Sequence, residues 1–150
     1  MSRKHLLVTL SAAAIAASAS VFAADYGTSA EAKAMLEKAV AAMNKDQASA
    51  LAMFAKGEGG FKDRDLYVMC GGPDGNFTAH PTLTGKSLKD LKDKSAAGKP
   101  IGEEFYKVAQ PGKISEVSYM WPRPGTTDPV EKVTYVTKVG NQVCAVGYYK

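Results

Sequence analysis

Residues 115–136 read SEVSYMWPRPGTTDPVEKVTYV, and this pattern predicts the β-hairpin around which the rest of the chain is organised. The first arm alternates with a period of two, and the residues on its apolar face are Val117, Tyr119 and Trp121. Two prolines and the turn residues 125–129 end this arm. In the second arm Lys132 and Tyr135 fall on opposite faces, because the side chains of a strand alternate.

The hairpin concentrates side chains suited to a pocket for a small anion. It carries the only Trp of the chain, two Tyr, Arg123 and Lys132. Aromatic walls with a few converging cations and hydroxyl groups are what such a pocket requires. The same residues also fit a structural role, in which the rings pack under a helix and Arg123 and Lys132 are solvated, because aromatic residues in strands usually belong to the core.

The first 23 residues have the features of a secretory signal peptide. Arg3 and Lys4 form a positive start, residues 6–19 are apolar and rich in alanine, and small residues precede an expected cleavage after Ala23. The alternative is an uncleaved membrane anchor, although the apolar run is shorter than the roughly 20 residues of a spanning helix. We therefore expect a signal peptide at 1–23 and one periplasmic domain at 24–150.

The composition of the 150 residues, 45% hydrophobic and 23% charged, is typical of one globular domain. The formal net charge of +4 falls to +2 without Arg3 and Lys4, and no run of five basic residues exists. A nucleic-acid partner is therefore not expected. No later segment reaches transmembrane length, so no membrane insertion is expected after signal cleavage.

Catalytic and metal-binding patterns are missing from the sequence. Paired carboxylates with a supporting His, a nucleophile elbow and a cluster of metal ligands are all absent. His80 is the only His outside the expected signal, and it could either donate a hydrogen bond to a ligand carboxylate or cap a turn. We expect no enzyme activity, no metal and no cofactor.

Two cysteines, Cys70 and Cys144, remain in the expected exported chain, each within a strand-like run. An even number of cysteines in an exported protein suggests a disulfide, which would stabilise the fold by on the order of 4 kcal/mol. Two separate buried thiols are the alternative. The pair would come close if the last strand lay beside the first one in the centre of the sheet.

The order of predicted elements indicates an α+β domain. A helix begins at Thr28 and Glu31, which have capping-box spacing, and Asp46 can cap a second, shorter helix. A strand hairpin, a polar loop and a short helix follow, at 65–79, 82–100 and 101–109. The opening hairpin and a last strand at 142–149 complete the chain, so long helices precede a mostly antiparallel sheet.

Within this order, specific residues resemble the single Cache domain, type 2, over nearly all of 28–149. The matching pieces include DLYV at 65–68, DG at 74–75, AHP at 79–81, GKSL at 85–88, YMWP at 119–122 and VGYY at 146–149. The resemblance implies a PAS-like fold, in which a long N-terminal helix packs on a five-stranded antiparallel sheet. Members of this family are extracytoplasmic sensors that bind small molecules, often short carboxylates.

The resemblance also implies a signalling partner. Most Cache domains lie between two transmembrane helices of a chemoreceptor or histidine kinase, whereas this sequence shows neither a second span nor an output domain. We expect an exported sensor domain that recognises a small organic anion and relays to a membrane-bound sensor kinase or chemoreceptor. The alternative is a regulatory subunit of a signalling complex that has no ligand of its own.

The ligand residues that the resemblance implies come from four parts of the chain. Tyr119 and Trp121 would form the pocket wall, and either Arg123 or Lys132 would balance the charge of the ligand. His80 and Tyr135 would donate hydrogen bonds to the ligand, and Phe105 would close the pocket as a lid. Lys132 and Tyr135 can touch one ligand only if a bulge or a twist intervenes in the strand.

Overall fold

The computed structural model describes residues 24–150. The expected signal peptide at 1–23 lies outside the described residues, and cleavage after Ala23 stays a prediction. Within 24–150, none of the helices combines the length and the apolar character needed to cross a membrane.

The sheet has six strands, all of whose pairings are antiparallel, in the order β1-β2-β6-β5-β4, with β3 paired to β2. The strand bounds are β1 (Lys62–Asp63), β2 (Leu66–Gly71), β3 (Phe77–Ala79), β4 (Ser115–Pro122), β5 (Pro129–Val139) and β6 (Gln142–Tyr149). The five strands that the sequence predicts correspond to β2–β6. The additional strand, β1, is only two residues long.

Local side chains set the limits of the first two helices. Helix α1 (Ser29–Lys45) begins with the predicted capping box between Thr28 and Glu31. Asp46 then accepts a hydrogen bond from the backbone of Ser49 and starts α2 (Gln47–Lys56). Gly57 ends α2 in the left-handed conformation, at φ 68°, which a residue without a side chain adopts at little cost.

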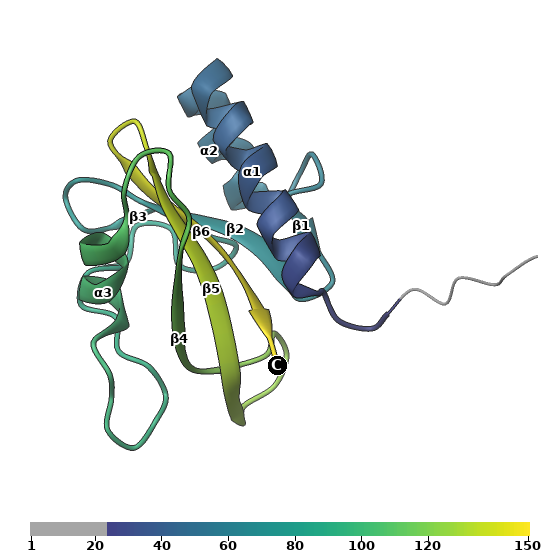
Figure 1. Cartoon of the computed structure of the whole chain (residues 1–150), viewed down its shortest axis with the longest axis vertical. Helices are drawn as coiled ribbons and strands as arrows, with labels where there is room; N and C mark the ends of the chain where they lie inside the picture. The colour runs from purple at the N-terminus through teal and green to yellow at the C-terminus, as the bar shows by residue number, and fades with distance from the viewer. Residues whose placement is uncertain (1–23) are drawn as a thin grey trace, which may run out of the picture.

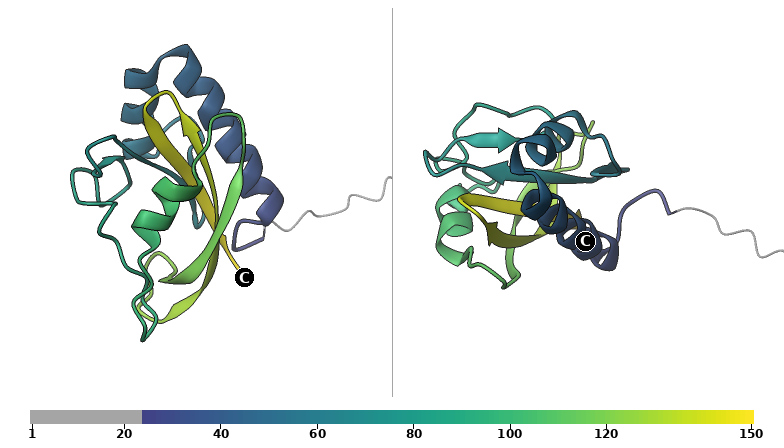
Figure 2. Two further views of the ribbon diagram at one scale, coloured as in Figure 1. Left: turned by 60° about the vertical axis from the view of Figure 1, so that its left-hand side comes forward. Right: turned by 90° about the horizontal axis from the view of Figure 1, so that it is seen from above.

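Helices cover both faces of the sheet (Figures 1 and 2). The face under α1 and α2 forms one hydrophobic core, which includes Leu36, Phe54 and Val146. The other face packs against α3 (Ile101–Val108) and the loop before it, in a second core that includes Phe105. Because side chains alternate along each strand, a single residue step in β5 separates the two cores.

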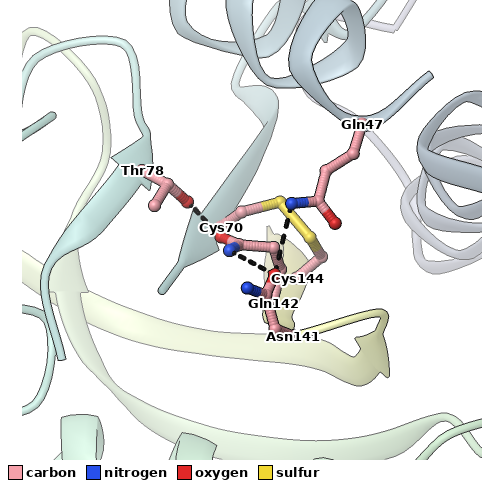
Figure 3. Close-up of a disulfide and its surroundings, with 6 residues drawn as sticks. All are labelled: Gln47, Cys70, Thr78, Asn141, Gln142 and Cys144. Carbon is pink, nitrogen blue, oxygen red and sulfur yellow. Dashed lines mark hydrogen bonds between the residues drawn. A yellow bond between two sulfur atoms is a disulfide. The ribbon is translucent and has the colours of Figure 1, made fainter. Parts of the chain in front are cut away.

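The predicted disulfide joins Cys70 and Cys144, which are direct partners in the register of β2 and β6. Both residues are fully buried in the core beneath the first two helices. Figure 3 shows the polar side chains beside this disulfide, where Asn141 accepts hydrogen bonds from the amides of Gln47 and Gln142. The bond therefore links two neighbouring strands in the middle of the sheet.

We expect replacement of both cysteines, Cys70→Ala with Cys144→Ala, to lower the free energy of unfolding by about 2–4 kcal/mol, because the unfolded chain regains the freedom of a long loop. Urea denaturation of the two proteins measures this difference, with the reduced wild type as the control. Mass spectrometry without reduction should detect the crosslinked peptide pair. Two thiols that react freely with an alkylating agent in the folded protein would contradict the expectation.

Candidate functional site

A cavity of about 370 Å³ lies on the sheet face that carries α3 and the preceding loop, at the end of β4 and β6. This volume is within the usual range for small-molecule pockets, about 300–1,000 Å³. The lining comes from β1, β2, the loop after β3, the end of β4, the β4–β5 turn and the end of β6: Lys62, Tyr67, His80, Pro81, Thr82, Leu83, Trp121, Pro122, Arg123, Pro124, Gly125, Thr126 and Tyr149. No Asp or Glu is among these lining residues.

Lys132 lies buried behind two of the lining rings, and its exposed fraction is 1%. Its Nζ donates a hydrogen bond of 3.0 Å to the hydroxyl of Tyr67. The same atom lies 4.5 Å from the ring centre of Tyr67 and 4.8 Å from that of Tyr149. Among residues 24–150, no carboxylate forms an ion pair with this ammonium. The rings stabilise its charge in part, because their faces are electron-rich.

The backbone of β6 makes room for Lys132. A Cβ atom on Gly147 would lie 2.5 Å from Cε of Lys132 and would also collide with the hydroxyl of Thr134. Lys132 pairs with Tyr149 in the register of β5 and β6, and with Tyr119 in that of β4 and β5. The lysine is therefore placed by a glycine beside it and by a tyrosine on each neighbouring strand.

His80 faces the cavity as a neutral hydrogen-bond donor. Its Nδ1 accepts backbone N–H bonds from Thr82, at 3.0 Å, and Leu83, at 3.1 Å, so the ring proton lies on Nε2. Burial and, secondarily, the charge of Lys132 lower the pKa of His80 to about 4. No hydrogen bond from Nε2 is formed within residues 24–150, so this N–H can serve a ligand.

Arg123 also lines the cavity, but its charge is balanced inside the protein. The guanidinium lies between two rings, 4.3 Å from the centre of Tyr26 and 5.1 Å from that of Tyr149. Its Nε is 3.8 Å from Oδ2 of the buried Asp65. The other oxygen of Asp65, Oδ1, accepts a hydrogen bond of 2.7 Å from the backbone of Gly27. Arg123 and Lys132 thus lie in different electrostatic environments, since only Arg123 faces a carboxylate.

Three of the four aromatic residues that the resemblance implies lie on the cavity side of the sheet, at different depths. Trp121 is half-buried and lines the cavity, while Tyr119 lies beside it with ring centres 6.2 Å apart. Tyr119 is buried, and its hydroxyl accepts a hydrogen bond of 3.0 Å from Thr134. Phe105 packs against Tyr119 in the core under α3, at 5.7 Å between ring centres. Only Trp121 reaches the cavity surface.

Tyr135 lies on the other face of the sheet from Lys132. Its hydroxyl is 2.7 Å from that of Ser29 in α1, and its ring stacks on Tyr148. The register of β5 with both neighbours is continuous, so no bulge brings Tyr135 round to the cavity. The structure thus brings together His80, Trp121, Arg123 and Lys132, and it places Tyr135 in the core beneath α1.

Sequence reasoning missed Tyr67 and Tyr149 as cavity residues and Asp65 as the partner of Arg123. Tyr67 is flanked by Leu66 and Val68, so its opposite orientation was readable from the alternation of the strand. Its position next to Lys132, however, depends on how β2 and β6 pair. The sequence indicates that pairing only through the expected disulfide between Cys70 and Cys144.

A second hollow, of about 480 Å³, runs along the outer side of α3. Its lining residues are Lys99, Pro100, Glu103, Glu104, Lys107 and Val108. Lys99 and Glu104 form an ion pair of 2.9 Å in partly exposed positions. Because its charges are solvated and paired, this groove lacks the buried polar groups that mark a specific ligand site.

Comparison with known proteins places the chain among Cache sensor domains. The family model described as Single Cache domain 2 matches residues 4–148. A methyl-accepting chemotaxis protein from Vibrio parahaemolyticus has a similar structure, with a TM-score of 0.64 and 23% identity, over 80% of this chain and 86% of that chain. No curated protein gives a significant match.

Two further solved structures share the fold. The periplasmic sensor domain of a chemotaxis protein has a TM-score of 0.56 and 24% identity, over 78% of this chain and 86% of that chain. A Cache chemosensory domain, described for its recognition of carboxylic acids, has a TM-score of 0.55 and 22% identity, over 78% of this chain and 84% of that chain. At these identities, the likeness establishes the fold.

We expect acid to destabilise the domain through His80. The pKa of His80 is about 4 in the folded protein, below its ordinary value of 6.5, so the unfolded chain binds the proton more readily. The stabilising contribution is therefore complete above pH 6.5 and is lost as the pH falls towards 4. Between pH 7 and about pH 4.5, the loss should reach about 2 kcal/mol.

The matched variant is His80→Asn, whose side-chain oxygen can accept the same two backbone N–H bonds but does not titrate in this range. Urea denaturation at both pH values, on wild type and variant, isolates the His80 contribution. An equal loss of stability in the two proteins would show that His80 titrates normally.

Proposed function

Because the chain belongs to the single Cache domain 2 family, we propose that it is an exported sensor domain, spanning residues 24–150, that binds a small organic anion and relays its presence to a membrane partner. A short carboxylate is the ligand class that the cavity favours. The recognition of carboxylic acids by a Cache domain of similar fold supports the same class.

The observation that carries this proposal is the buried ammonium of Lys132. A charge removed from water and left without a counter-ion costs several kcal/mol, and proteins seldom keep one without a use. Here the rings of Tyr67 and Tyr149 offset part of that cost. An anion bound in the adjoining cavity attracts the ammonium and offsets the rest of this cost. The burial of Lys132 therefore favours negatively charged ligands.

The other cavity residues suit the rest of such a ligand. The Nε2 proton of His80 can donate to a carboxylate oxygen, and the ring of Trp121 offers an apolar surface to its carbon chain. A hydrogen bond to a charged group contributes roughly 1.5–3 kcal/mol. One such bond, together with packing against rings and the attraction of the nearby Lys132 charge, corresponds to a dissociation constant of about micromolar for a small ligand.

The relay belongs to the proposal as well. Two of the similar structures are from chemotaxis proteins, one of them a periplasmic sensor domain. Their likeness supports a membrane-bound receptor or sensor kinase as the partner and the periplasm as the location. The residues of the cavity are suited to binding, with His80 held neutral and Lys132 held behind two rings, and we propose no catalytic step.

We expect Lys132→Met to weaken binding of short carboxylates by about tenfold to a hundredfold, because the variant removes the one buried charge beside the cavity that lacks a carboxylate partner in residues 24–150, and keeps a side chain of similar length. Isothermal titration calorimetry with a panel of monocarboxylates measures the effect. Lys86→Met, on an exposed lysine away from the cavity, is the matched control. The free energy of unfolding of Lys132→Met should be retained or raised, because an unpaired buried charge is gone.

Two results would contradict the proposal. The first is wild-type protein that binds none of the carboxylates in the panel. The second is a Lys132→Met protein that binds them as tightly as the wild type does.

A further inference from the structure

We propose that Asp65 restricts the cavity to ligands with a single negative charge, because it neutralises Arg123 and leaves Lys132 as the one buried cation near the cavity without a carboxylate partner in residues 24–150. This inference rests on the proposed anion-binding function and names the ligand class more narrowly. The predicted ligand is a monocarboxylate without an amino group. Asp65 does not line the cavity and acts through Arg123, so it is a positioning residue that determines specificity.

Among the charges around the cavity, one buried positive charge has no partner within residues 24–150. Lys132 has no carboxylate partner among residues 24–150, and Arg123 faces Asp65 at 3.8 Å. The Nδ1 atom of His80 accepts two backbone N–H bonds, which requires a neutral ring. Lys62 also lines the cavity, but it is exposed, so water screens its charge. One buried positive charge therefore awaits a ligand.

A second carboxylate on the ligand would have no buried cation of its own. To approach Arg123, this second carboxylate would have to lose its hydration shell. Because Nε of Arg123 already faces Asp65, the second carboxylate of the ligand and the carboxylate of Asp65 would repel each other. Oδ2 of Asp65 and Nε of Arg123 are both buried and make no hydrogen bond within the described chain, so water does not screen this repulsion. Dicarboxylates are thus disfavoured by the protein's own anion.

An amino group on the ligand is disfavoured for a different reason. An ammonium needs a carboxylate or several carbonyl groups in place of its water shell. No Asp or Glu lines the cavity, and Asp65 behind it is engaged with Arg123 and with the backbone of Gly27. Lys132 would repel the ammonium as well. Amino acids should therefore bind more weakly than the matching monocarboxylates.

Asp65→Asn tests the role of the charge with little change in shape. The amide oxygen can keep the hydrogen bond from Gly27, while the negative charge next to Arg123 is removed. Arg123 then becomes a second unbalanced cation at the cavity wall. Asp63→Asn is the control, since Asp63 is exposed and pairs with Arg64 instead. The double variant Asp65→Asn with Arg123→Gln removes both charges and should restore the wild-type preference.

Calorimetry at neutral pH with two matched series measures the preference: propionate, malonate and alanine, then pentanoate, glutarate and norvaline. In at least one series, wild-type protein should bind the monocarboxylate about tenfold or more tightly than the dicarboxylate and the amino acid. Asp65→Asn should shift the ratio of monocarboxylate to dicarboxylate affinity by about tenfold or more towards the dicarboxylate. Asp63→Asn should leave the ratio unchanged.

Each result has a distinct meaning. A wild type that binds the dicarboxylate or the amino acid as tightly as the monocarboxylate overturns this inference and leaves the anion-binding function standing, and this measurement needs no variant to fold. An unchanged ratio in a folded Asp65→Asn protein also overturns it. If wild-type protein binds none of the six compounds, the proposed function fails and the inference falls with it.

Discussion

The burial of the Lys132 ammonium against the rings of Tyr67 and Tyr149 is the constraint on which the organisation of the cavity depends. Those rings come from β2 and β6, and the lysine from β5, so three strands must pair in one register before the contact exists. Gly147 must lack a side chain at the same level. Such a contact contributes little net stability, because the cost of dehydrating the charge is large. The rest of the fold has to hold it in place.

Because side chains alternate along each strand, the residues that stabilise the fold most and the residues that form the cavity lie on opposite faces of the sheet. The disulfide and the larger hydrophobic core lie under α1 and α2, on the face that also holds Tyr135. The cavity and Lys132 lie on the opposite face, and β2 contributes Cys70 to one and Tyr67 to the other. The disulfide and the larger core are therefore separated from the cavity by the thickness of one sheet. A binding face can carry an unfavourable charge when another face supplies the stability.

Sequence reasoning reached the elements and the two hairpins, but it gave the pairing of β2 with β6 only as a condition for the disulfide. The capping box of α1, the hairpin of β4 and β5, and the alternation that separates Lys132 from Tyr135 follow from local patterns, which act over a few residues. Strand β1 was missed because two residues carry no periodicity. The choice between Arg123 and Lys132 as the unbalanced cation was also out of reach, because it depends on Asp65, which lies far away along the chain.

The Asp65–Arg123 pair joins the cavity to both ends of the described chain. Asp65 holds the backbone of Gly27, just before α1, and Arg123 contacts the ring of Tyr26 and the carbonyl oxygen of Lys150. A ligand that changes the field at Arg123 therefore acts on the groups that position these ends. In a sensor, a ligand shifts the equilibrium between two conformations only by the difference between its binding free energies for them. The Asp65–Arg123 pair, which we propose selects the charge of the ligand, therefore also contacts residues close to both ends of the described chain.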